Sequence, residues 1–263
     1  MTDLFCIDTG AGQPLVLLHG GFLDHHMWDD QIPAFAPHRR VIAPDARGHG
    51  RSPNAEAPFR SADDLAGLLG HLDTGPAVLV GVSLGASTAV DTALEHPELV
   101  SAVVVTGSGI SDTGSTEPHF NDPWTARTWS TWASAIAIGD LDVSVETLLL
   151  FAAGPHRTLD DLDPQVLDRL RTATRGTMVK HHAGETDWRV PLASTLERAA
   201  TIDVPVLAIS GTLDSPDHIE MAELLASTVV NGHAVSIDGT AHYPNLERPD
   251  VYNKLLTDFL TAL

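Results

Sequence analysis

Short apolar runs alternate with longer amphipathic stretches along this 263-residue chain. The apolar runs, rich in Val, Leu and Ile, have the length of β-strands and cover residues 14–19, 40–43, 77–81, 102–106, 205–210 and 234–238. Most are nearly continuous in apolar residues, which is typical of strands that are covered on both faces. Stretches with helical spacing cover residues 61–72, 83–96, 219–229 and 249–263. This alternation predicts an α/β fold with a doubly wound, mainly parallel sheet.

The alternation is interrupted between residues 107 and 201, where the pattern indicates no strand. A loop rich in Gly, Ser, Thr, Asp and Pro (107–123) comes first, and helical stretches follow at 124–138, 143–153 and 164–182. We therefore predict a helical lid at 107–201, inserted into a core made of residues 1–106 and 202–263. Tryptophans are concentrated in this lid, at Trp124, Trp129, Trp132 and Trp188. Trp129 and Trp132 are three apart and share a helix face, so they either pack the lid onto the core or line a substrate pocket.

Charge and composition narrow the range of partners. Fifteen Lys and Arg against 35 Asp and Glu give a net charge of −20, which disfavours binding to nucleic acid or to anionic lipid. Cys6 is the only cysteine, so neither an intramolecular disulfide nor a cysteine-based zinc cluster is expected. The N-terminus lacks a secretory signal pattern, and no apolar run approaches the roughly 18 residues of a membrane span. We expect a cytoplasmic protein that acts on a small molecule, without nucleic acid, membrane, metal or cofactor.

The strongest chemical signal is Gly81-Val82-Ser83-Leu84-Gly85, which lies between a predicted strand and a predicted helix. A G-x-S-x-G sequence in that context forms a sharp turn that presents its serine as a nucleophile. The glycines are needed because side chains at those positions would collide in so tight a turn. Ser83 would then lie at a helix N-terminus, where free amides and the helix dipole favour negative charge. We predict that Ser83 is the nucleophile.

A serine hydroxyl needs a base, and the base needs an orienting carboxylate. In the chain order that goes with this turn, the acid and then the histidine follow the late strands. His242 lies in the loop after the strand at 234–238, and Asp214 follows the strand at 205–210. We predict Asp214 as the carboxylate, with Asp217 as the runner-up, whose other expected role is to cap the helix that begins near His218. His19 ends a strand and is expected to make structural hydrogen bonds.

Acyl transfer also needs hydrogen-bond donors for the developing oxyanion. The backbone amide directly after the nucleophile, that of Leu84, is one candidate. The second donor is expected from the loop His19-Gly20-Gly21-Phe22, because glycines there let the backbone approach a substrate. Both the Gly21 and the Phe22 amides fit this role, and the sequence does not separate them.

These motifs together resemble the α/β-hydrolase superfamily over nearly the whole chain. The matching segments are His19–Phe22, Asp45–Ser52, Gly81–Gly85, Gly211–Asp214 and Ala241–Pro249. The resemblance implies a helical lid after the strand at 102–106, and it implies that Asp45–Ser52 is a structural turn. Members commonly begin with an antiparallel hairpin, whereas only residues 4–8 precede the turn at 10–13, so the first strand of that hairpin is expected to be missing.

Within this superfamily the chain is most similar in pattern to small lidded esterases, enol-lactone hydrolases and cofactor-free perhydrolases. The leading hypothesis is a serine hydrolase that cleaves a carboxylic ester or lactone, with an uncharged, fairly apolar substrate suggested by the lid tryptophans. A serine nucleophile leaves carbon–carbon bond hydrolases, thioesterases and perhydrolases open as alternatives. It disfavours dehalogenases and epoxide hydrolases of this fold, which use aspartate at the same turn. Other classes also stay open, namely a non-catalytic ligand receptor that keeps the triad and a lyase or cofactor-free oxygenase.

Overall fold

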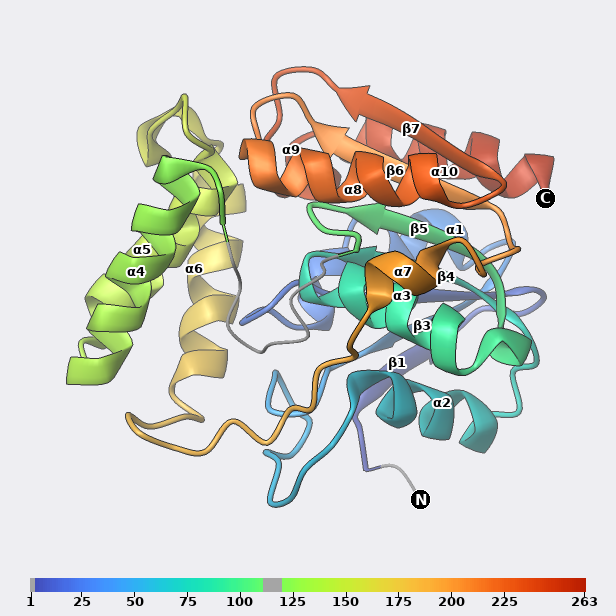
Figure 1. Cartoon of the computed structure of the whole chain (residues 1–263), viewed down its shortest axis with the longest axis horizontal. Coiled ribbons are helices and arrows are strands. Elements are labelled where there is room, and N and C mark those ends of the chain that lie inside the picture. The colour runs from blue at the N-terminus through green and yellow to red at the C-terminus, as the bar shows by residue number, and fades with distance from the viewer. Residues whose placement is uncertain (1–2, 111–119) are drawn as a thin grey trace.

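The computed structural model describes residues 3–110 and 120–263, in which seven strands form one sheet (Figure 1). Their order across the sheet is β1-β3-β2-β4-β5-β6-β7. The strands are β1 (Cys6–Thr9), β2 (Pro14–Leu18), β3 (Arg40–Pro44), β4 (Ala77–Val82), β5 (Val100–Thr106), β6 (Val206–Gly211) and β7 (Gly232–Ile237). Every neighbouring pair is parallel except β1 and β3. The predicted α/β fold with a mainly parallel sheet is confirmed.

Helices cover both faces of the sheet. The core helices are α1 (Ile32–Phe35), α2 (Ser61–His71), α3 (Leu84–Glu95), α8 (Pro216–Thr228), α9 (Pro244–Glu247) and α10 (Pro249–Ala262), with short turns of 3₁₀ helix at η1 (His25–Trp28) and η2 (Pro97–Leu99). One apolar cluster contains side chains of α1 and α10, and the other contains side chains of α2, α3 and α8. In β4, Val78 and Val80 pack into the first cluster, whereas Ala77 and Leu79 pack into the second. This two-sided burial explains why the strands are nearly continuous in apolar residues.

The segment between β5 and β6 is helical, and part of its opening loop (111–119) lies outside the described residues. Its elements are α4 (Pro123–Ile138), α5 (Leu141–Ala153), η3 (Leu159–Asp161), α6 (Pro164–Met178) and α7 (Thr195–Ala199). Asp122, Asp140 and Asp163 accept hydrogen bonds at the N-termini of α4, α5 and α6, which fixes where those helices begin. In Figure 1 these three helices stand together beside the sheet, whereas α7 returns to lie against α3.

Two further expectations concern the first strand of the sheet and membrane-spanning helices. β1 pairs antiparallel with β3 and forms one edge of the sheet in the part of the chain that is described, as the second strand of the expected hairpin would. No helix among the described residues is both long and apolar enough to cross a lipid bilayer.

Candidate active site

Ser83 lies at the junction between β4 and α3, in a backbone conformation that non-glycine residues rarely adopt. Its φ of 53° and ψ of −113° place it in a strained region, as expected for a nucleophile at a sharp strand–helix turn. The flanking glycines are required by close backbone contacts. A Cβ atom on Gly81 would lie 2.2 Å from the carbonyl of Gly85, and one on Gly85 would lie 2.1 Å from the Leu18 oxygen. The Ser83 hydroxyl does not cap α3, so it is available for chemistry.

His242 approaches Ser83 through the adjacent strand. The Ser83 amide donates a 2.8 Å hydrogen bond to the oxygen of Thr106 at the end of β5. The next residue, Gly107, lies flat against the His242 ring, because a Cβ atom there would be 2.6 Å from Cε1 of the histidine. Ser83 and His242 both line the same cavity. The ends of β4 and β5 therefore place the serine and the histidine in one site.

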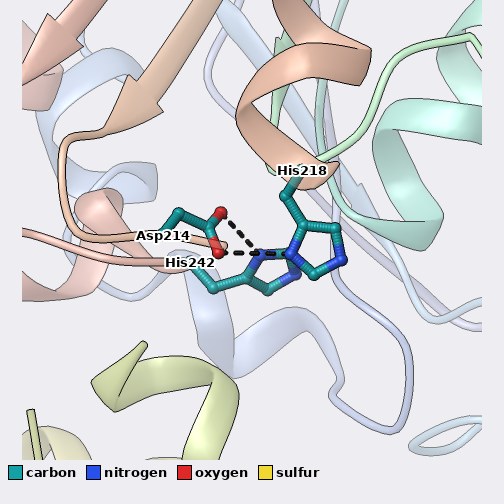
Figure 2. A group of neighbouring side chains, drawn as sticks. All are labelled: Asp214, His218 and His242. Atoms are coloured by element: carbon teal, nitrogen blue, oxygen red, sulfur yellow. Dashed lines mark hydrogen bonds and ion pairs between the residues drawn. The ribbon is translucent and has the colours of Figure 1, made fainter. Parts of the chain in front are cut away.

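Asp214 and His242 form a buried hydrogen-bonded pair (Figure 2). His242 Nδ1 donates to Asp214 Oδ2 over 2.9 Å, and the two side chains are 4% and 1% exposed. Asp214 follows β6 and His242 follows β7, and their loops meet at Gly211. A Cβ atom on Gly211 would lie 2.2 Å from the Ala241 oxygen, so only glycine permits this approach.

The pair is tuned toward a charged carboxylate and a neutral imidazole. Burial works to raise the pKa of Asp214, but the electrostatic attraction of His242 and His218 and the hydrogen bonds that both donate outweigh it and hold that pKa below its usual range. Burial lowers the pKa of His242, and this effect outweighs the opposing attraction of Asp214. With Nδ1–H committed to Asp214, the neutral His242 presents Nε2 as an unprotonated base.

A second histidine, which the sequence analysis did not assign, shares the same carboxylate. His218 Nδ1 lies 3.2 Å from Asp214 Oδ1, and the rings of His218 and His242 are 4.3 Å apart (Figure 2). The spacing of four residues between Asp214 and His218 is the signal that could have revealed it, since α8 begins between them at Pro216.

Asp217, the runner-up carboxylate, has a different role. Its two oxygens accept hydrogen bonds from the amides of Asn121 (3.1 Å) and Asp122 (2.9 Å), so it fastens the start of α4 to α8. The expected cap role was wrong, because Ser215 accepts the hydrogen bond from the amide of His218 at the N-terminus of α8.

The predicted oxyanion donors lie near one another. A Cβ atom on Gly21 would be 3.8 Å from the Cβ of Leu84, and Gly21, Phe22 and Leu84 all line the cavity. Phe22 has a φ of 60°, another strained non-glycine conformation at this site. Leu84 is the first residue of α3, where helix amides have no partner within the helix. The backbone amides of Gly21 and Phe22 both stay candidates for the second donor to the oxyanion.

His19 holds this loop in place, as predicted. Its Nδ1 donates to the Gly20 oxygen over 2.7 Å, and its Nε2 accepts from the Ala46 amide over 2.9 Å. Asp45 likewise acts within the fold, because it is buried and accepts hydrogen bonds from the amides of His25 and Arg51.

The described residues enclose a cavity of about 1670 Å³ between the lid and the carboxyl ends of the strands. Trp129, Trp132 and Trp188 line it, and the rings of Trp129 and Trp132 are 4.9 Å apart, which confirms that they share a helix face. Trp124 is not among its lining residues. Its ring packs edge-on against Phe151, which does line the cavity.

Asp214, His218 and His242 also form the one group, within the described chain, whose possible metal-ligand atoms lie within 4.8 Å of one another. Both carboxylate oxygens already accept hydrogen bonds from the two Nδ1 atoms, and Oδ1 accepts a further one from the Ser215 amide. These contacts let the group act as an acid–base set.

Comparison with known proteins gives the family of the chain. The family described as alpha/beta hydrolase fold matches residues 13–249, and the chain belongs to this family. The chain is 26% identical over 259 residues to (E)-2-((N-methylformamido)methylene)succinate hydrolase of Acinetobacter baylyi, covering 96% of this chain and 92% of that protein. It is 25% identical over 243 residues to 3-oxoadipate enol-lactonase 1 of the same species, covering 91% and 85%.

A solved structure gives the same result. The chain superposes on a thermophilic esterase from Thermogutta terrifontis with a TM-score of 0.78 and 25% identity, covering 98% of this chain and 93% of that one. Fold, family and relatives together identify the protein as a hydrolase of the α/β-hydrolase fold.

Proposed function

We propose that this hydrolase cleaves a carboxylic ester or lactone through an acyl-enzyme on Ser83. One observation carries the proposal: His242, which is hydrogen-bonded to the buried Asp214, lines the same cavity as a serine held in a strained turn at a helix N-terminus. That combination supplies a nucleophile, an oriented base and a place for negative charge.

In the first half of the reaction, His242 Nε2 takes the proton of Ser83, and Oγ attacks the substrate carbonyl. Asp214 keeps the imidazole in the required tautomer and stabilises its cation. The Leu84 amide, with that of Gly21 or Phe22, binds the oxyanion, and each such donor contributes on the order of 3 kcal/mol. His242 then gives its proton to the leaving alkoxide or enolate, which leaves the acyl group on Ser83.

In the second half, His242 Nε2 takes a proton from water, whose oxygen attacks the acyl carbon. The bond between that carbon and Ser83 Oγ breaks, and the proton returns to the serine. The carboxylic acid is released, and the site regains its starting state.

The proposed substrate is uncharged and fairly apolar, and the aromatic residues on part of the cavity wall support this. Near the histidines it is bordered by Phe120, Phe151 and His218, and farther along the lid by Trp129 and Trp132. Aromatic walls favour flat or extended apolar groups. The names of the relatives, an enol-lactonase and an esterase among them, support an ester or lactone as the scissile group.

The test is a substrate panel of aryl esters, alkyl esters, lactones, a thioester and a vinylogous diketone. We expect turnover of esters or lactones that falls at least about 10³-fold in Ser83→Ala, by analogy with loss of a triad nucleophile. Ser101→Ala, at an exposed position of β5, is the matched control and should keep full activity. Turnover confined to the diketone would indicate a carbon–carbon bond hydrolase, and turnover confined to the thioester would indicate a thioesterase. Stoichiometric ligand binding without any turnover would indicate a receptor.

A further inference from the structure

The carboxylate of Asp214 carries more than the catalytic mechanism requires. A serine hydrolase needs one imidazole on its acid, whereas here His242 occupies Oδ2 and His218 occupies Oδ1. His218 is 7% exposed, lines the cavity with Ser83, and is held by its position in the first turn of α8. Such a buried polar side chain at a reaction centre calls for a function of its own.

The two imidazoles have the same orientation. Each donates Nδ1–H to the shared carboxylate, so in its neutral form each carries an unprotonated Nε2 on the far side of its ring. The ring planes are only 39° apart, and Figure 2 shows the rings side by side with both Nε2 atoms turned away from Asp214. Both histidines line the cavity, so each brings an Nε2 acceptor to its wall.

Aromatic side chains surround this pair. The centroid of the Phe151 ring lies 5.6 Å from that of His218 and 6.0 Å from that of His242. The Phe120 ring is edge-on to His218, with their centroids 6.1 Å apart. The Phe120 and Phe151 rings accept no strong hydrogen bond, so on this side of the pair the two Nε2 atoms are the acceptors available to a water molecule. A bound water needs two or more polar partners, and the pair supplies them.

We propose that His218 positions the hydrolytic water of the second half-reaction. Its Nε2 accepts one hydrogen bond from that water, while His242 Nε2 takes the other proton. The water oxygen then forms the bond to the acyl carbon, the carbon–Oγ bond of Ser83 breaks, and His242 returns the proton to Oγ. The inference rests on the acyl-enzyme proposed above. His218 is a positioning residue for deacylation and has no matching role in acylation, in which no water reacts.

This role separates the two half-reactions, which a purely structural role would not. If His218 only held Asp214, its loss would weaken His242 as a base in both halves, and both rate constants would fall together. If it positions water, acylation is spared. The two rate constants can be measured separately with an activated aryl ester, by the burst of released phenol and by the decay of the acyl-enzyme in intact-mass spectra.

The key variant is His218→Phe, with His218→Gln as the conservative one. We expect deacylation to fall at least about ten-fold in His218→Phe, since poor positioning costs up to about 100-fold, with acylation changed less than about three-fold. The kcat value and KM then fall together, a full burst appears, and kcat/KM is nearly unchanged. His218→Gln, which keeps a donor and an acceptor, should recover part of the deacylation rate. His38→Phe, at an exposed position, is the control for loss of an imidazole elsewhere.

The outcomes distinguish this inference from the function on which it rests. Equal loss of both rate constants, or unchanged deacylation, in a variant with the melting temperature of the wild type would overturn the role of His218 while leaving the acyl-enzyme intact. If His218→Phe does not fold, His218→Gln carries the test through the same ratio of rate constants. An ester that turns over without acylating Ser83 would instead overturn the proposed function.

Discussion

At the scale of single residues, Gly107 sets the space that is available to the ring of His242. It has a φ of 61°, and its missing side chain makes room for the His242 ring. Gly107→Ala should push the imidazole away from Asp214 and Ser83, because the new Cβ would be 2.6 Å from Cε1. We expect kcat/KM to fall about 100-fold, the effect of a misplacement of about 1 Å.

The control for this prediction is Gly75→Ala. Gly75 has a similar φ of 66°, but a Cβ atom there would meet nothing within 4 Å. Both variants carry a similar backbone strain of roughly 1–2 kcal/mol, but only Gly107→Ala adds a collision with the His242 ring, so Gly75→Ala reports the effect of backbone strain alone. Equal activity in the two variants would show that Gly107 does not define the position of His242.

The titration of His242 should be visible in the pH profile. Activity needs the neutral imidazole, and burial lowers the pKa of His242, so protonation takes place only at a pH below the usual imidazole value of about 6.5. We therefore expect kcat/KM for an uncharged ester to stay on its plateau as the pH falls to 6.5 and to decline below it. Circular dichroism at each pH checks that the fold persists. A decline with its midpoint above pH 7 would contradict this account.

At the scale of elements, Arg157 joins the lid to the loop that carries His242. It follows α5, donates to the Ala153 oxygen over 2.9 Å, and binds Glu247 through two hydrogen bonds of 2.6 and 3.1 Å. Glu247 in turn accepts a 2.8 Å hydrogen bond from the Ala241 amide. The largely buried ion pair between Arg157 and Glu247 thus connects the end of α5 to the loop that carries His242.

Arg157→Ala should lower the free energy of unfolding by about 2 kcal/mol, because it leaves the Glu247 carboxylate buried without its partner. Arg175→Ala is the comparison, since its ion pair with Asp142 is exposed and should contribute less than about 0.5 kcal/mol. Urea unfolding monitored by tryptophan fluorescence measures both values. Equal losses would show that the Arg157 contact stabilises no more than a surface pair does.

Helix α3 carries an acid, Asp91, whose ionisation opposes folding. Burial, and then the charge of Glu95, raise the pKa of Asp91 to about 7. A carboxyl group whose pKa is raised by folding destabilises the fold as the pH rises from about 4 to 7, because the folded form then holds the extra proton. Asp91→Asn should therefore raise the free energy of unfolding at pH 8 by up to about 4 kcal/mol, and by much less at pH 5. The melting temperature at the two pH values measures this difference. A gain that is independent of pH would contradict this linkage.

Part of the sheet and of the candidate site could be predicted from the sequence. Six of the seven strands in the described residues were predicted to within two residues, because burial on both faces of most of them leaves an unbroken apolar signal. The short edge strand β1 was not among the predicted strands. Ser83, Asp214 and His242 were placed by their positions after three strands. His218 was not, because its contact with Asp214 depends on α8 beginning at Pro216 rather than near His218. The contact of Gly107 with His242 depends on how loops from β5 and β7 meet, which no local pattern records.

At the scale of the whole molecule, the reaction centre is assembled from segments far apart in the chain. The loop after β2, the turn after β4 and the loops after β5 and β7 all contribute lining residues to one cavity, and the loop after β6 brings Asp214 to His242. Helices α4, α5 and α6 stand beside this end of the sheet (Figure 1). This is the arrangement expected of open α/β sheets, whose ligands bind at the carboxyl ends of the strands. The function proposed for this arrangement requires that Ser83 carries the acyl group.

The most direct measurement of that claim is covalent trapping with a fluorophosphonate, followed by peptide mass mapping. The account predicts one phosphonate per chain on Ser83, no label in Ser83→Ala, and at least about ten-fold slower labelling in His242→Ala, because the hydroxyl then lacks its base. Label on any other residue of the wild type, or labelling of Ser83→Ala at the wild-type rate, would contradict it.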